Sequence, residues 1–137
     1  MQWDDSLNAG FTTGKPFTEF VKGERSYEHI NVASQMVDKD SLFHSISHMV
    51  NIRKQHHTFG RGTMEWVITE NPSLAIYTRK HQAELLLIIN NLSDSPQTTS
   101  LSSEHHADYM ELISNTEQHL EASLTLQPYA HLWLKRK

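Results

Sequence analysis

Ten histidines are the first residues in this sequence whose type and spacing could do chemistry. His44 and His48 stand four residues apart, so a helix would present both imidazoles on one face, as many zinc sites require. No glutamate directly follows His44, and no third ligand can be named by spacing. The other close pairs, His56–His57 and His105–His106, are adjacent residues in loop-like sequence. Surface histidines are therefore favoured over a metal centre, and we expect no metal and no cofactor.

The carboxylates do not form a recognisable catalytic pair. Glycosidic hydrolysis needs two carboxyl groups held across a cleft by a rigid scaffold, and the pattern around Glu70, Glu104 and Glu111 predicts none. Asp4 and Asp5 fit better as turn residues that hydrogen-bond their own backbone. The sequence also lacks a Gly-x-Ser-x-Gly elbow, a Ser-x-x-Lys pattern and a Gly-rich phosphate loop. We therefore predict no catalytic residue in this chain.

The three tryptophans divide into two kinds. Trp66 and Trp133 alternate into predicted strands and are expected to be core or half-buried packing residues. Trp3 lies in the polar opening segment MQWDDSLNAGF, beside Gln2 and Asn8. Because sugars bind aromatic platforms next to amide side chains, Trp3 is the better candidate for a ligand-facing role. Packing against a neighbour outside this sequence would explain it equally well.

Composition excludes several classes of partner. The formal net charge is −4, with both signs scattered along the 137 residues, so no basic stripe is available for phosphates and we expect no nucleic acid. No apolar run reaches the roughly 18 residues of a membrane span, and no signal peptide or cysteine is present. The expectation is a cytoplasmic chain that does not enter a membrane.

The elements that must position these side chains change character along the chain. Glycines and Pro16 interrupt residues 1–37, which indicates an irregular arm. An amphipathic helix then follows, because apolar residues recur on one helical face: Leu42, Phe43, Ile46, Met49 and Val50. Asp38 or Asp40 could cap its start, and Gly60 lies just past its end. The segment GRG at 60–62 is interpreted as a turn.

Arg53 falls on the same helical stripe as Leu42 and Ile46, which is unusual for a charged residue. A carboxylate or several carbonyl oxygens could meet the guanidinium under the helix in a structural ion pair. Alternatively, its aliphatic stem lies on the apolar seam while the charge reaches water. The sequence does not separate these two roles.

From residue 62 onward, short apolar or alternating segments are separated by turn-rich pieces, which predicts an antiparallel all-β unit of about six strands. The run LLLII at 85–89 contains no polar residue, so it is expected to be a central strand covered on both faces. The predicted fold class is mainly β: an antiparallel β-sandwich preceded by an irregular arm and one amphipathic α-helix.

Three motifs in order carry a family resemblance. MQWDDSLNAGF is similar to the segment P-M-Q-W-x-x-x-x-N-A-G-F that follows the last barrel strand in the α-glucosidase branch of the α-amylase family. INVASQ and the helix ending in IRK at 52–54 resemble the next elements of those enzymes. Downstream, ELLLIINNLSDSPQ and LTLQPYAHLWLK resemble their sandwich strands. Within the branch, FGRGTMEWV and NPSLAIYTRK are similar to trehalose synthases. NAGFTTGKPF and ELISN with LTLQPY are more similar to oligo-1,6-glucosidases, dextran glucosidases and trehalose-6-phosphate hydrolases.

This resemblance implies a division of the chain: residues 1–60 as the end of a (β/α)8 barrel, its loop plus last helix, and residues 61–137 as the C-terminal antiparallel sandwich. The family's nucleophile Asp, acid/base Glu and stabilising Asp lie on earlier strands, so this chain alone is expected to be inert. In the longer parent enzyme, an α-glucoside would be the substrate. Gln2, Trp3, Asn8 and Phe11 would belong to its pocket rim, or would only shape the loop.

Two further expectations accompany this interpretation. The apolar stripe of the helix would lose its barrel partner, so the chain could form a homodimer through that barrel-facing helix or leave residues 1–60 disordered. The alternative function is a free-standing carbohydrate-binding or protein-interaction β-sandwich, in which an exposed tryptophan would serve as a sugar platform.

Overall fold

In the computed structural model, which describes residues 1–137, the chain forms two compact units, Met1–Val50 and Asn51–Lys137. The first unit contains two short 3-10 turns, η1 (Leu7–Gly10) and η2 (Gly23–Arg25), and one short helix, α1 (Val32–Val37). Helix α2 (Leu42–Gln55) begins in the first unit and ends in the second. The second unit holds helix α3 (Thr58–Arg61), a third 3-10 turn and all eight strands.

Helix α1 was not expected within the irregular arm. Its start is a capping box: the Asn31 Oδ1 accepts a hydrogen bond from the Ser34 backbone N–H at 2.8 Å, and the Ser34 Oγ accepts one from the Asn31 N–H at 3.3 Å. These two bonds satisfy donors that a helix start leaves without partners. A helix of six residues offers too few periodic positions for its apolar pattern to be recognised.

The predicted amphipathic helix is present as α2, but the predicted cap is wrong. Ser41 precedes the helix, and its Oγ accepts a hydrogen bond from the His44 N–H at 3.4 Å. The Asp38 carboxylate instead accepts from the Asp40 N–H at 3.0 Å, two residues along, and so closes a local turn. Serine is as favourable a cap as aspartate. Because the Asp38 carboxylate is used in the local turn, Ser41 is the residue that caps the start of α2.

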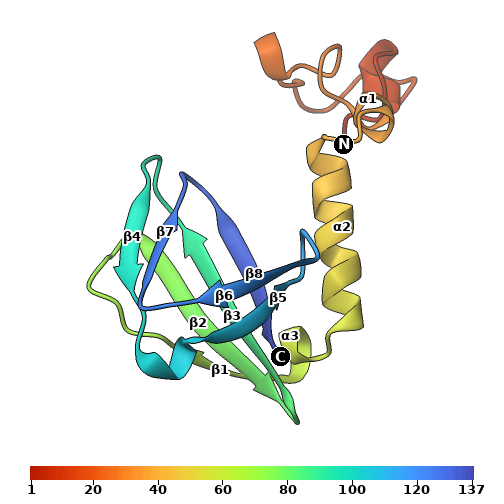
Figure 1. Ribbon diagram of the computed structural model, residues 1–137. Helices are drawn as coiled ribbons and strands as arrows, with labels where there is room; N and C mark the ends of the chain where they lie inside the picture. The colour runs from red at the N-terminus through yellow and green to blue at the C-terminus, as the bar shows by residue number, and fades with distance from the viewer. The chain divides into compact units, whose positions relative to one another are not determined.

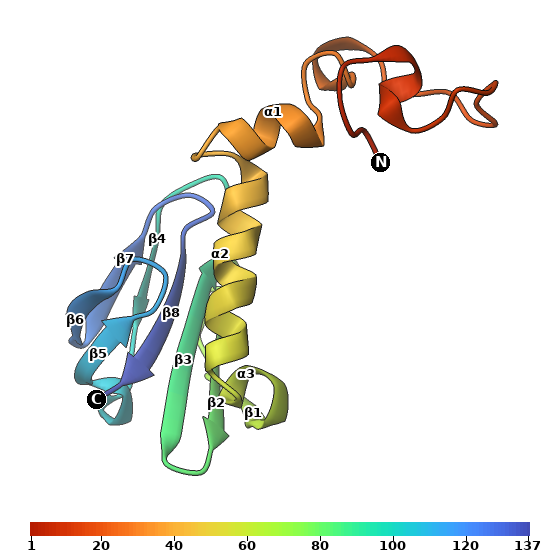
Figure 2. The ribbon, with the colours of Figure 1, turned by 90° about the vertical axis from the view of Figure 1, so that its right-hand side faces the viewer.

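The second unit is an antiparallel β-sandwich, so the predicted fold class is confirmed (Figures 1 and 2). A six-stranded sheet has the order β1-β2-β3-β8-β5-β6, and a two-stranded sheet pairs β4 with β7. The strands are β1 (Thr63–Trp66), β2 (Leu74–His81), β3 (Glu84–Asn91), β4 (Gln97–Ser100), β5 (Ala107–Glu111), β6 (Thr116–Leu120), β7 (Ser123–Leu126) and β8 (His131–Arg136).

Strand β3 is the central strand that its unbroken apolar run predicted. Leu87 and Ile89 face the core between the two sheets, whereas Leu86 and Ile88 face the opposite side, where Phe59 of α3 packs. All four β3 side chains are buried, and each contributes roughly 1.5–3 kcal/mol of burial free energy. The two faces explain why this strand lacks the polar alternation of its neighbours.

Two expectations about the surface of the second unit are wrong. Trp66 was expected to be a core or half-buried packing residue, yet it is 65% exposed, because β1 is an edge strand whose outer side has no partner. The segment at 60–62 is not a simple turn, since Gly60 and Arg61 belong to α3.

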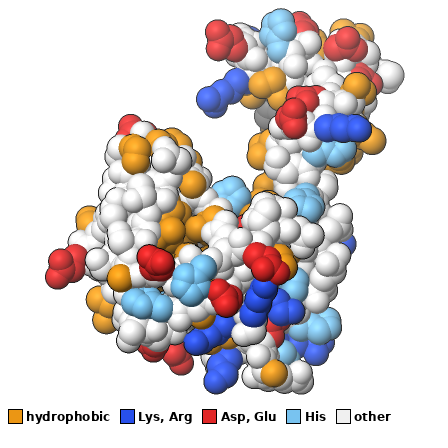
Figure 3. Space-filling view, in the orientation of Figure 1, with side chains coloured by type: hydrophobic (Ala, Val, Ile, Leu, Met, Phe, Trp, Pro, Cys, Tyr) orange, Lys and Arg blue, Asp and Glu red, His pale blue; other side chains and the backbone are white.

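On the face seen in Figure 3, acidic and basic side chains are intermixed over the strands. No helix has the length and apolar character needed to cross a bilayer.

Candidate functional site

The backbone of the opening segment adopts a conformation that explains its Asn-Ala-Gly sequence. Asn8, Ala9 and Gly10 have successive positive φ angles of 56°, 58° and 63°. Asparagine and glycine enter this left-handed region most readily. At Gly10 an added Cβ would lie 2.6 Å from either carboxylate oxygen of Asp4. A side chain at position 10 would therefore displace Asp4 as well as strain the backbone.

Asn8 uses its side chain to hold the loop that follows. Its Nδ2 donates hydrogen bonds to the carbonyl oxygens of Thr12, at 2.9 Å, and of Gly14, at 3.0 Å. Both amide hydrogens are thus committed within the loop. In this structure, Asn8 shapes the segment that carries Phe11.

Gln2 joins the opening segment to a motif far along the chain. Its Nε2 donates to the Ile30 carbonyl oxygen at 2.5 Å, across 28 residues of sequence. The backbone continues this connection, because the Val32 N–H donates to the Gln2 carbonyl oxygen at 2.9 Å. The Ala33 N–H likewise donates to the carbonyl oxygen of Trp3 at 2.9 Å. The segments MQW and INVA therefore form one local structure, with the capped start of α1 beside Trp3.

Two aromatic side chains of this local structure remain open to solvent. Trp3 is 46% exposed and Phe11 is 63% exposed. Phe11 borders a hollow of about 630 Å³ that Asp4 also lines, whereas Gln2, Trp3 and Asn8 do not line it. The structure thus brings the four predicted rim residues into one segment, but only Phe11 borders the hollow.

The only carboxylate in that hollow is already engaged. The Asp4 Oδ1 accepts hydrogen bonds from the Ser6 hydroxyl and the Ser6 N–H, at 2.5 and 2.9 Å, and these bonds hold the pKa of Asp4 below its ordinary value of 3.8. An ionised carboxylate fixed in a turn accepts hydrogen bonds but is a poor proton donor. With exposed aromatics and amides tied to the backbone, the segment can contact a ligand but offers no acid–base pair.

The remaining candidate residues lie apart from this segment. Arg53 is exposed near the end of α2, in the second unit, and takes part in no ion pair of the structure, so its role on the helix seam stays a prediction. His44 was expected to face solvent, but it is half-buried, with Nε2 3.0 Å from the Met36 carbonyl oxygen. No three His, Cys, Asp or Glu side chains are grouped closely enough to hold a metal ion.

Sequence reasoning missed Ile30 and Asn31 as the supports of Gln2 and Trp3. Ile30 supplies the carbonyl oxygen that Gln2 binds, and Asn31 caps α1, whose first N–H groups bind the MQW backbone. The signal that could have found them is the Asn-x-x-Ser spacing of the capping box at Asn31 and Ser34. That signal identifies the helix start, but not the distant residue it contacts.

Two family models match this chain. Residues 1–62 match "Alpha amylase, catalytic domain", and residues 64–133 match "Maltogenic Amylase, C-terminal domain". An oligo-1,6-glucosidase from Heyndrickxia coagulans is 33% identical over 129 residues, which is 94% of this chain and 22% of that protein. A trehalose-6-phosphate hydrolase from Bacillus subtilis (strain 168) is 32% identical, over 94% of this chain and 23% of that protein.

Solved structures share the fold. The trehalulose synthase from Pseudomonas mesoacidophila MX-45 superimposes with a TM-score of 0.82 at 30% identity, covering 99% of this chain and 24% of that one. The chain therefore spans about a quarter of the length of the proteins it matches.

Proposed function

The chain belongs to the α-amylase family, and from this premise we propose that it is the C-terminal part of an enzyme that acts on α-glucosidic bonds. The substrate would be an α-glucoside of the maltose, isomaltose or trehalose type. The observation that carries the proposal is the set of hydrogen bonds between MQW and INVA. Through these bonds, two distant motifs that resemble the barrel end of the family form one local structure. Names of the relatives, an oligo-1,6-glucosidase and a trehalose-6-phosphate hydrolase, support this class of bond.

We further propose that the 137-residue chain is inert by itself, because the nucleophile and the acid/base carboxylate belong to barrel strands outside it. Three carboxylates of this chain are held by hydrogen bonds within it. Asp4 is bound by Ser6, Glu84 by His56 and Thr58, and Glu111 by backbone N–H groups and Ser114. Asp4 is the only carboxylate that lines its hollow, whereas glycoside hydrolysis needs two carboxyl groups across a cleft.

Within the parent enzyme, Gln2, Trp3, Asn8 and Phe11 would form part of the pocket rim. Their contacts support two kinds of role. The side-chain amides of Gln2 and Asn8 donate hydrogen bonds to carbonyl oxygens of the chain, so they would set the loop's shape. Trp3 and Phe11 keep exposed ring surface, so they would contact the sugar.

The apolar face of α2 supports a proposal about partners. Leu42, Phe43, Ile46 and Val50 are 68%, 38%, 50% and 43% exposed. In the parent enzyme we propose that the barrel covers this face. In the isolated chain, a second copy would cover it, because a contiguous stripe of large exposed apolar side chains is unfavourable in water.

Reading the coding DNA immediately upstream of the Met1 codon tests the proposed function. The proposal expects an open frame that encodes barrel strands and the three spaced carboxylates of the family. An in-frame stop codon followed by a ribosome-binding site would contradict it. As a second readout, the isolated chain should release no glucose from maltose, isomaltose or trehalose.

A further inference from the structure

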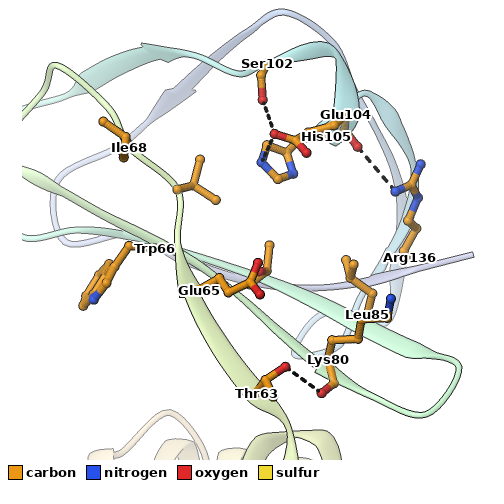
Figure 4. A pocket seen from close by; sticks show the side chains of 12 residues that line it. Thr63, Glu65, Trp66, Ile68, Lys80, Leu85, Ser102, Glu104, His105 and Arg136 are labelled. Carbon is orange, nitrogen blue, oxygen red and sulfur yellow. Dashed lines mark hydrogen bonds and ion pairs between the residues drawn. The ribbon is translucent and has the colours of Figure 1, made fainter.

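A polar groove lies between strands β1 and β2 on one side and residues 102–105 on the other (Figure 4). Side chains alternate between the two faces of a strand. Ile76 of β2 faces the inter-sheet core, so Thr78 and Lys80 lie on the same face. Their partners on β1, Glu65 and Thr63, share that face. The inner face of the sandwich therefore changes from apolar to polar at Thr78.

The other walls of this groove come from segments distant in sequence. Ser102, Glu104 and His105 reach it from the 3-10 turn η3 (Ser103–His105) and the residue before it, and Arg136 reaches it from the end of β8. His105 is buried, and Leu85 of β3 adds an apolar patch. Together the lining residues enclose about 550 Å³, space enough for a glucosyl unit or two.

The groove carries charges of both signs, and two of them, Glu65 and Lys80, have no partner within the chain. Glu65 and Glu104 supply two carboxylates, and Lys80 and Arg136 supply two cations. The carboxylate of Glu65 and the ammonium of Lys80 make no hydrogen bond or ion pair within the chain. Arg136 donates only to the Glu104 carbonyl oxygen, at 3.4 Å. The Glu104 carboxylate accepts from the Ser102 hydroxyl at 3.1 Å, and its Oε1 lies 3.8 Å from the His105 Nε2.

We propose that this groove binds a neutral polyhydroxylated ligand, a glucosyl unit of an oligosaccharide. A balanced set of two carboxylates and two cations disfavours an anion or a cation alike, because either would face like charge. The same set offers acceptors and donors to the alternating hydroxyls of a sugar, through charge-assisted hydrogen bonds. Leu85 provides a surface for sugar C–H groups.

The groove binds without an aromatic platform. Trp66 stands at its border, but the indole points away from the cavity in Figure 4 and meets Tyr77 edge-on, with ring centroids 5.5 Å apart. Hydrogen bonds in an open, solvated groove yield little net free energy each. The affinity expected is therefore weak, with a dissociation constant of about 1 mM.

A ¹H–¹⁵N NMR titration of the 137-residue chain with maltose and with isomaltose tests this inference. Saturable shifts are expected in the amides of residues 63–68, 78–85, 102–105 and 136. Shifts that saturate instead in residues 1–14, or no saturable shift at all, would overturn it. Sodium sulfate and spermidine should give weaker shifts than the sugars, and a stronger saturable response to either ion would overturn it too.

Glu65→Gln should weaken sugar binding by roughly fivefold or more, because it removes one charged acceptor while keeping the side-chain shape. Glu121→Gln is the matched control, since Glu121 is exposed and does not line the groove, and it should leave binding unchanged. Equal sugar binding by the unmutated 137-residue chain and by Glu65→Gln would reject the assigned site. Because this readout needs no catalysis, its failure is distinguishable from failure of the proposed function.

Discussion

Glu111 is a carboxylate whose role is to hold the turn between β5 and β6. It is 3% exposed, and it accepts hydrogen bonds from the N–H groups of Ile113, Ser114 and Trp133 and from the Ser114 hydroxyl. Burial raises the pKa of Glu111, but these bonds from Ser114, Trp133 and Ile113 outweigh burial and leave the pKa below its ordinary value of 4.5. The ionised form is therefore the native one at neutral pH.

Glu111→Gln should lower the free energy of unfolding of the sandwich by about 2–3 kcal/mol. The amide removes the charge and turns an NH₂ group toward at least one backbone N–H that has no other partner. Urea unfolding followed by circular dichroism measures the change. Glu121→Gln, at an exposed position, is the control and should stay within about 0.5 kcal/mol of the parent. A Glu111→Gln variant as stable as that control would contradict the assigned role.

Glu84 connects the start of β3 to His56, which lies between α2 and α3, and to Thr58, the first residue of α3. Its Oε1 lies 2.7 Å from the His56 Nδ1, its Oε2 accepts from the Thr58 hydroxyl at 2.5 Å, and the Lys135 ammonium lies 3.6 Å away. Partial burial raises the pKa of Glu84, yet the bonds to Thr58 and His56 and the nearby charges together hold the pKa below 4.5.

The depressed pKa values of Glu84 and Glu111 contribute to the pH dependence of unfolding. A carboxyl whose folded pKa lies below its unfolded value contributes stability that is fully present above the unfolded value, here 4.5. That contribution is lost as the pH falls through the folded pKa. The free energy of unfolding should therefore decrease as the pH drops below 4.5, and Glu84→Gln should make that decrease shallower. Urea titrations at several pH values measure it, and an unchanged acid slope in Glu84→Gln would contradict the expectation.

Neither carboxylate could have been assigned its role from the sequence. The partners of Glu84 are 28 and 26 residues away, and the Trp133 N–H that binds Glu111 is 22 residues away. Local periodicity carries no information about such pairs. The sequence placed Glu111 only among scattered carboxylates. Gln2, Trp3, Asn8 and Phe11 were grouped through the family resemblance, and the structure supplies the hydrogen bonds of Gln2 and Asn8.

At the scale of elements, prediction succeeded where the pattern was long. Helix α2 has fourteen residues and strand β3 has eight, and both were recognised from their apolar spacing. The strands that were missed, β4 and β6, have four and five residues, and each has one fully buried side chain, Thr99 and Leu120. Short elements with one buried position show no period, which is why the strand number was underestimated.

The Gly60-Arg61-Gly62 segment provides a matched test of the junction between α3 and β1. At Gly62 an added Cβ would lie 2.6 Å from the Thr58 carbonyl oxygen and 3.0 Å from that of Lys80, whereas at Gly60 nothing lies within 4 Å. Gly62→Ala should destabilise the sandwich by about 1–3 kcal/mol through this crowding. Gly60→Ala should be neutral or stabilise it by up to about 1 kcal/mol, as alanine favours the helix.

Thermal unfolding of both alanine variants measures this pair of effects. The expected order of midpoints places Gly60→Ala at or above the parent and Gly62→Ala below it. The reverse order, or equal midpoints, would show that the close approach at Gly62 does not constrain this junction.

The apolar face of α2 predicts self-association of the isolated chain. Ile46→Lys places a charge within the exposed stripe and should lower the dimer fraction at least several-fold, as measured by sedimentation velocity. Asn51→Lys adds the same charge at an exposed polar position of the helix and should leave association unchanged. An unmutated 137-residue chain that stays monomeric with an ordered N-terminal arm would contradict the proposal.

At the scale of the whole molecule, the two units differ in how much apolar core each one contains. The second unit has two apolar clusters of its own around β3. The first unit has one fully buried apolar residue, Ala9, and it exposes Leu7, Phe17, Met36 and Val37. A unit with so little core depends on a covering surface. This contrast supports the proposal that residues 1–60 complete a larger barrel while residues 61–137 fold as a sandwich.

The most direct test joins this chain to a barrel that carries the catalytic carboxylates. Residues 1–137 would replace the matching segment, 22% of the length, of the Heyndrickxia coagulans oligo-1,6-glucosidase, and a second chimera would take only residues 61–137 from this chain. The account predicts that the chimeras release glucose from isomaltose while neither separate part does. Two folded, monodisperse chimeras without activity, or glucose release by the 137-residue chain alone, would contradict it.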